Sequence, residues 1–164
     1  MSFEPVTVYL GLGSNMENRQ DNLQKALDLL SQRLRIGQVS SIYDTEPLGN
    51  VNQPRFLNLV CQVHTTLPPL GLLALVKGFE LKLGRLPAKA NTPRLIDIDI
   101  LFYGDQVIST PELVIPHPRL IERAFVLTPL AEIAPDLVHP VNGKTIRELQ
   151  GITETQGVLR WENG

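Results

Sequence analysis

The chain has 164 residues, a hydrophobic content of 43% and a formal net charge of -2. This length suits one domain with a substantial core, so we expect a single domain over residues 1–164. The chain has no strongly basic stretch, which argues against nucleic acid as its main partner. Its first residues, Met1-Ser2-Phe3-Glu4-Pro5, lack the basic and apolar pattern expected of a signal segment, and the sequence has no apolar run of membrane-spanning length. Its one cysteine, Cys61, lies in an apolar run. We therefore expect a cytoplasmic protein with no membrane partner and a buried thiol.

The first half of the chain predicts three strands and a helix. Residues 7–12 predict a strand that ends at Gly13, and leucines at helical spacing predict a helix over residues 19–34. Residues 39–43 predict a second strand. A loop rich in proline and glycine follows, and residues 56–66 predict a third strand.

The second half adds a helix, a strand and a less regular tail. Pro68 and Pro69 open the second helix, and Gly84 stands where a C-terminal cap is expected. The strand over residues 95–102 follows, and then a turn at Gly104. The order β-α-β-β-α-β is the split arrangement of ferredoxin-like folds, so we predict an α+β protein with a mostly antiparallel sheet and helices packed on it. A short helical stretch and a looser tail are the expected C-terminal additions.

Two aspartates, Asp97 and Asp99, alternate with isoleucines in the strand over residues 95–102. Alternation at period two places the isoleucines toward the core and both carboxylates on the opposite face, about 7 Å apart. Like charges on one strand face repel, whereas a divalent cation would attract both. Magnesium typically takes one or two carboxylates and fills its other positions with water and phosphate oxygens. The pattern therefore indicates a metal site, although an exposed face with two solvated charges has the same alternation.

Phe56 and Asn58 share one face of the predicted third strand. An aromatic ring beside an amide suits a flat heterocycle with donors and acceptors on its edge, and a half-buried Phe beside a solvated Asn is the simpler interpretation. The segment Gly11-Leu12-Gly13-Ser14-Asn15 lacks the spacing of a P-loop or a dinucleotide fingerprint. Its glycines predict a tight turn and a close approach of the backbone to a flat ligand.

Basic residues gather in the loops before the aspartate strand and after Pro116. Several guanidinium donors near a metal strand suit a polyphosphate, although solvated loop charges have the same composition. An isolated histidine such as His117 is also more often structural than functional. The members of this cluster are Arg85, Lys89, Arg94, His117, Arg119 and Arg123.

Taken together, these segments resemble one enzyme family, the 6-hydroxymethyl-7,8-dihydropterin pyrophosphokinases of folate biosynthesis. The resemblance covers about residues 7–140 and consists of eight blocks in the family's order. The blocks are Gly11-Leu12-Gly13-Ser14-Asn15, Tyr43-x-Thr45-x-Pro47-Leu48-Gly49, Gln53-Pro54-x-Phe56-Leu57-Asn58, Glu80-x-x-x-Gly84-Arg85, Pro93-Arg94-x-x-Asp97-x-Asp99, Pro116-His117, Arg123-x-Phe125 and Glu132-Ile133-Ala134-Pro135.

The resemblance implies transfer of pyrophosphate from ATP to the hydroxymethyl group of the pterin, with release of AMP. It implies that Asp97 and Asp99 hold two magnesium ions. It further implies roles for the other matching positions, with small molecules as the only partners of a monomer. These are catalytic roles for Arg85, Arg94 and His117, pterin contacts from Thr45, Leu48, Phe56, Asn58, Arg123 and Phe125, and ATP contacts from Glu80, Arg85, Arg94, Ile100 and His117.

The chain departs from the family pattern around the loop over residues 85–94. Ala90, Asn91 and Thr92 stand where the family usually has a basic residue, a Trp and a Gly, and the loop is one residue short. Pro87 replaces a common arginine, and Pro118 replaces a common tyrosine. These departures concern closure over ATP and leave open a second interpretation, a ferredoxin-like binding module that kept a pterin pocket without turnover. Detecting AMP separates the two.

Overall fold

The computed structural model describes residues 4–16, 18–45, 55–84, 95–153 and 158–161. Its main sheet has the strand order β5-β1-β4-β3-β8, with β2 also paired to β4, and every pairing is antiparallel. This order confirms the predicted ferredoxin-like arrangement, in which the first strand lies between the two later ones. The strands are β1 (Val6–Ser14), β2 (Arg35–Val39), β3 (Tyr43–Thr45), β4 (Phe56–Thr65), β5 (Asp97–Tyr103) and β8 (Val158–Arg160).

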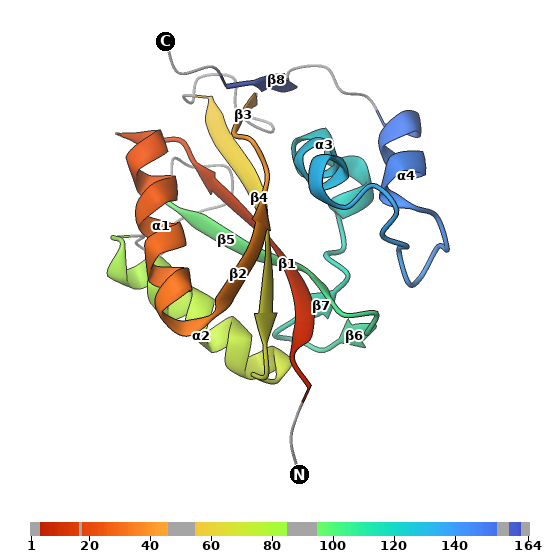
Figure 1. Ribbon diagram of the computed structural model, residues 1–164, viewed down its shortest axis with the longest axis horizontal. Helices are drawn as coiled ribbons and strands as arrows, with labels where there is room; N and C mark the ends of the chain where they lie inside the picture. The colour runs from red at the N-terminus through yellow and green to blue at the C-terminus, as the bar shows by residue number, and fades with distance from the viewer. Residues whose placement is uncertain (1–3, 17, 46–54, 85–94, 154–157, 162–164) are drawn as a thin grey trace.

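Helices cover both faces of this sheet, two on each side (Figure 1). On one face, α1 (Arg19–Arg33) and α2 (Pro69–Lys82) bury Leu23, Leu30, Leu72 and Val76 against the sheet. Gly84 ends the second helix as expected, with a φ of 96° that favours glycine. No helix in the described ranges is long and apolar enough to cross a membrane.

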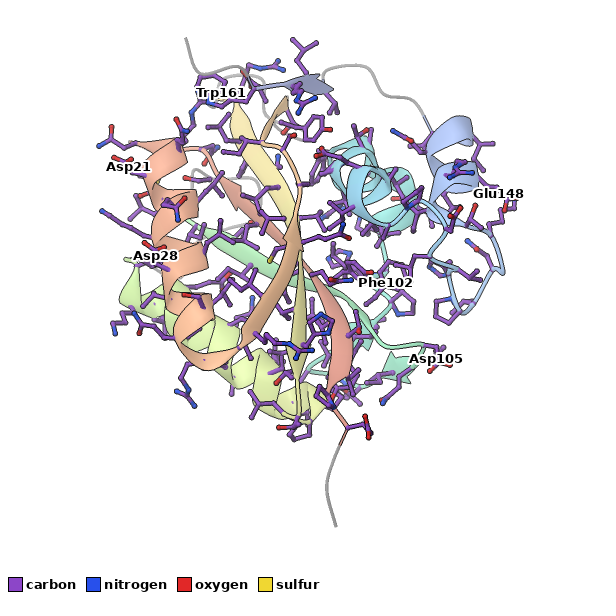
Figure 2. All side chains as sticks on the ribbon, viewed as in Figure 1. Asp21, Asp28, Phe102, Asp105, Glu148 and Trp161 are labelled. Atoms are coloured by element: carbon purple, nitrogen blue, oxygen red, sulfur yellow. The ribbon has the colours of Figure 1, made fainter. Side chains whose placement is uncertain are left out.

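The second core lies on the opposite face, under α3 (Ala124–Ile133) and α4 (Ile146–Ile152). Leu127 and Leu130 of α3 pack there with Val60 of β4 and Phe102 of β5. Phe102 points from the sheet toward these helices (Figure 2). The same face carries Asn58 and the two aspartates, because they alternate with the residues of the first core.

The predicted strand over residues 39–43 is wrong in its bounds. The chain forms two strands here, β2 and β3, which both pair with β4 and are separated by residues 40–42. Ser40 causes part of the break, because its hydroxyl accepts a hydrogen bond from the Val60 amide at 2.9 Å. A side-chain oxygen thus accepts a hydrogen bond that a backbone carbonyl of the ladder would otherwise accept. The pairing register with β4 shifts between β2 and β3, as at a bulge.

The C-terminal region is more regular than the predicted loose tail. After β5, a small hairpin forms from β6 (Ile108–Ser109) and β7 (Val114–Ile115), and a 3-10 turn, η1 (Leu120–Glu122), precedes α3. Thr145 caps α4, and its capping box with Glu148 is a sequence signal that predicts this helix start. The strand β8 then pairs with β3 and extends the sheet, which the short segment Val158–Arg160 does not reveal by its own pattern.

Candidate functional site

The central feature of the site is a row of residues across three strands. In β1, Gly13 lies opposite Asp97 of β5 on one side and opposite Asn58 of β4 on the other. Gly11 likewise lies between Asp99 and Val60. Directly opposed residues point to the same face of a sheet. The structure therefore brings the predicted metal strand and the predicted pterin strand together, with two glycines between them.

The glycines do not form the predicted tight turn, because β1 continues through both of them to Ser14. The structure shows a close approach at Gly13, to the Asn58 side chain, whereas the predicted approach to a flat ligand stays a prediction. A Cβ atom there would lie 2.6 Å from Oδ1 of Asn58. Gly13 therefore leaves space for the Asn58 amide and leaves the sheet surface flat between Asn58 and Asp97.

The aspartate strand has the predicted alternation. Ile98 and Ile100 are 1% and 4% exposed in the first core, whereas Asp97 and Asp99 are partly exposed on the other face. Burial, followed by the charge of Asp97, raises the pKa of Asp99 to about 6, although Lys77 and Arg123 act in the opposite direction. Crowding two carboxylates in a desolvated position costs free energy, and a cation at the pair would offset that cost.

The donor set of this pair fits magnesium. Both side chains offer the hard oxygen ligands that magnesium prefers. Within the described ranges, no group of three or more His, Cys, Asp or Glu side chains could hold a metal ion. An ion at Asp97 and Asp99 would therefore complete its coordination with water and substrate oxygens, as is usual for magnesium at phosphate sites.

At the end of the row that is predicted to bind the pterin, Asn58 and Thr45 are buried and hydrogen-bonded to each other. Asn58 is 8% exposed and Thr45 is 2% exposed, and Nδ2 of Asn58 donates to Oγ1 of Thr45 at 2.6 Å. Phe56 lies two residues from Asn58 in β4 and is half-buried. The hydrogen bond holds the Asn58 amide in one orientation, with Oδ1 toward Gly13. Leu48, which was predicted to complete this edge, lies outside the described residues.

Arg123 and Phe125 lie at the start of α3, on the same side of the sheet. The Arg123 guanidinium carbon is 5.5 Å from the centre of the Phe125 ring, within cation–π range. Burial lowers the pKa of Arg123, and the carboxylates of Asp99 and Asp97 act against that shift. Among the described residues, the buried Nε atom of Arg123 has no hydrogen-bond partner. The guanidinium therefore lies near the acid pair and has one buried donor without a partner among the described residues.

His117 is half-buried near the same charges. Its amide donates to the Leu101 carbonyl at 3.0 Å, and its Nδ1 accepts a hydrogen bond from the Arg119 amide at 3.3 Å. Burial, followed by the charges of Arg123 and Arg119, lowers the pKa of His117 to about 4. The ring is therefore neutral at pH 7, and because Nδ1 accepts, the proton is on Nε2.

Glu80 has a structural contact that sequence reasoning missed. It is 2% exposed, its Oε2 accepts from the Ile98 amide at 2.7 Å, and its Oε1 pairs with Lys77 at 3.1 Å. Glu80, in α2, thus holds the backbone of β5 at Ile98, the residue between the two aspartates. Lys77 is a second residue without a sequence prediction, and its positive charge acts to lower the pKa of Asp99.

The resemblance implies that Ile100 contacts ATP, near its adenine base, and the structure places the Ile100 side chain in the core. A contact to a base there would have to come from its main chain, because β5 is the edge strand of the described sheet. Arg85 and Arg94, predicted near the phosphates, lie outside the described residues, as does the loop between them.

An acid pair near a guanidinium on one face of a sheet is an arrangement suited to an enzyme that acts on phosphates with a divalent cation. Comparison with known proteins specifies the class further. The family model for 7,8-dihydro-6-hydroxymethylpterin-pyrophosphokinase (HPPK) matches residues 9–135. The chain belongs to this family, and it is therefore a pyrophosphokinase, a transferase that acts in folate synthesis.

Relatives agree with this assignment, and solved structures agree with the fold. The 2-amino-4-hydroxy-6-hydroxymethyldihydropteridine pyrophosphokinase of Aquifex aeolicus is 43% identical over 144 residues, which cover 88% of this chain and 90% of the relative. The folic acid synthesis protein fol1 of Pneumocystis carinii is 42% identical over 88% of this chain, but the chain spans only 20% of that longer protein. A solved structure of Plasmodium falciparum HPPK-DHPS matches with a TM-score of 0.77 and 21% sequence identity. The match covers 92% of this chain and 46% of the Plasmodium chain, and it supports the fold.

Proposed function

We propose that this chain transfers pyrophosphate from ATP to 6-hydroxymethyl-7,8-dihydropterin across the row formed by Asn58, Gly13 and Asp97. That row is the observation that supports the proposal. Two strand spacings of about 4.8 Å separate its ends by about 10 Å. A flat ring held by Asn58 at one end would direct its hydroxymethyl group toward the acid pair at the other.

Each described side chain has a role in this proposal that suits its surroundings. Phe56 and Phe125 stack on the pterin, and Asn58 with Thr45 binds its polar edge. Arg123 and His117 donate to phosphate oxygens, since the guanidinium lies near the acid pair and the neutral imidazole has a proton on Nε2. Asp97 and Asp99 would hold two magnesium ions, whose chemistry is to neutralise charge on the phosphates when bound.

The reaction forms a bond between the pterin hydroxyl oxygen and the β-phosphorus of ATP. It breaks the bond from that phosphorus to the oxygen bridging the α-phosphate, so AMP leaves and the hydroxyl proton is released. Such transfers depend mostly on positioning and charge neutralisation. Asn58 and the aromatic rings orient the acceptor, Arg123 and His117 align the phosphates, and Arg85 and Arg94 belong to the same proposal through the family resemblance.

The direct test measures AMP formed from ATP and the hydroxymethyl pterin at varied magnesium. The wild-type chain should form AMP only when both substrates and magnesium are present, and Asp97→Asn should form almost none while still binding the pterin. Magnesium beyond the amount that saturates ATP should raise the rate further if a second ion takes part. Pterin binding without any AMP would contradict the proposal and would indicate the binding module instead.

We infer in addition that the chain acts as a monomeric single domain in the cytoplasm, with small molecules as its only partners. The support is the ordinary composition and the absence of strongly basic stretches. Sedimentation of the purified protein tests the oligomeric state. A stable dimer at micromolar concentration would overturn that part of the inference.

A further inference from the structure

We propose that Glu132 is a positioning residue for the pterin site, which it serves by joining the C-terminal end of α3 to β3. The inference rests on the proposed function, because it assumes that the pterin lies between α3 and the sheet. Glu132 belongs to a block of the family resemblance, Glu132-Ile133-Ala134-Pro135, to which no role in binding or chemistry was assigned above. We call Ser41, Tyr43, Glu132 and Arg160 the β3–α3 clasp.

The carboxylate of Glu132 accepts all but one of the hydrogen bonds in this clasp. The Ser41 amide donates to both oxygens of Glu132, at 3.1 and 3.0 Å, and the Ser41 hydroxyl donates at 3.0 Å. The Tyr43 hydroxyl donates to Oε1 at 2.7 Å. The remaining contact joins Nη2 of Arg160, in β8, to the Ser41 hydroxyl at 2.7 Å. Three segments that are far apart in the sequence therefore meet at Glu132.

The break between β2 and β3 makes this contact possible. Ser41 lies in the interruption, so its amide is not part of either strand's ladder with β4. A backbone amide needs an acceptor, and a carboxylate is a strong one. The irregularity that misplaced the predicted strand thus gives α3 its attachment point on the sheet.

The clasp connects to the pterin residues on both sides. In the sheet, Tyr43 lies directly opposite Asn58, and Thr45 lies two residues further along the same strand. In the helix, Phe125 precedes Glu132 by seven residues, which is two helical turns of 3.6 residues, so both side chains lie on one face of α3. A helix of this length, about 15 Å, is short and rigid. Fixing its C-terminal end therefore sets the distance between the Phe125 ring and the Asn58 amide.

The charges agree with a carboxylate that stays ionised. Burial acts to raise the pKa of Glu132, but hydrogen bonds from Tyr43 and Ser41 and the charge of Arg160 leave it below its usual value. Burial and then the contact with Glu132 raise the pKa of Tyr43 to about 12, so the phenol keeps its proton as the donor. Glu132 is exposed to solvent. Its replacement by Gln leaves no buried charge, and we expect such a variant to fold.

The test uses Glu132→Gln and Tyr43→Phe, with Tyr103→Phe as the matched control. Tyr103 also loses one phenolic hydrogen bond, to the Leu67 carbonyl, but at the opposite end of β5 from Asp97. Fluorescence titration with the pterin and with an ATP analogue gives both dissociation constants, and steady-state kinetics gives KM for each substrate. We expect both clasp variants to weaken pterin binding roughly tenfold, or about 1.4 kcal/mol, with ATP binding and kcat little changed.

Two further variants separate this inference from the proposed function. Asn58→Ala and Phe125→Ala must weaken pterin binding in the same titration, and if they do not, the pterin site itself is misplaced. If they do and the clasp variants bind the pterin as the wild type does, Glu132 has no positioning role. An equal loss for pterin and ATP, matched by Tyr103→Phe, would show general loosening and also overturn the proposal. Combining Glu132→Gln with Tyr43→Phe should give less than the sum of the two effects, since both remove one shared contact.

Discussion

Replacing Asp99 by Asn should stabilise the metal-free protein at the same time as it removes activity. The pKa of Asp99 is raised from 3.8 to about 6, first by burial and then by the charge of Asp97. A pKa difference of one corresponds to about 1.4 kcal/mol, so keeping Asp99 ionised in the folded state costs at most about 3 kcal/mol. Asn has nearly the same shape and no charge, and we expect Asp99→Asn to recover much of this cost.

The pH dependence has a definite sign. Between pH 4 and pH 6 the folded state binds more protons at Asp99 than the unfolded state does, so its contribution to stability falls as the pH rises through this window. The advantage of Asp99→Asn should therefore be largest at pH 8 and vanish near pH 3.5. For a chain of this size, about 3 kcal/mol corresponds to roughly 6–12 °C in Tm, which is the upper limit of the expected difference.

Thermal and urea unfolding in EDTA at pH 8 and pH 3.5 measure this directly. Asp105→Asn is the control, because Asp105 lies in the exposed turn after β5 (Figure 2), beyond the end of the strand opposite Asp97. Adding magnesium at pH 8 should reduce the difference in Tm between Asp99→Asn and the wild type, because the ion should stabilise only the wild type. The reasoning is refuted if Asp99→Asn is no more stable than the wild type at pH 8, or if its advantage persists unchanged at pH 3.5.

Three other predictions concern the pterin edge, His117 and the loop over residues 85–94. Asn58→Ala should weaken pterin binding by about 1–3 kcal/mol, the cost of an unpaired buried polar group, and leave ATP binding unchanged in calorimetry; equal losses would indicate misfolding. His117 should remain neutral to well below pH 6 in an NMR titration, since its pKa is about 4. Its contribution to the free energy of unfolding should be lost as the pH falls from about 6.5 toward 4. A titration midpoint near 6.5 would contradict the argument that burial lowers this pKa. Amides of residues 85–94 should gain hydrogen-exchange protection only when an ATP analogue and pterin are both bound, and equal protection without ligands would exclude a closing lid.

Local patterns in the sequence determined most of the elements and the positions of the acid pair. Period-two alternation is a property of a single strand, so it placed the isoleucines in the core and Asp97 and Asp99 opposite them without knowledge of any neighbour. Leucines at helical spacing and Gly84 as a cap located the two long helices in the same way. The order of these elements then indicated the sheet, because connection rules leave few arrangements for six alternating segments.

Tertiary structure decided how those faces meet. Gly13 serves as a spacer only because β4 and β5 flank β1, and its steric role depends on the position of the Asn58 side chain in another strand. The split into β2 and β3 depends in part on a hydrogen bond from the Val60 amide to Ser40, and β8 joins the sheet only because β3 presents an edge. Glu132 reaches Ser41 across 91 positions of the chain. Contacts between distant segments have no local signature in the residues that make them, so periodicity and capping rules could predict the elements of this site but not its assembly.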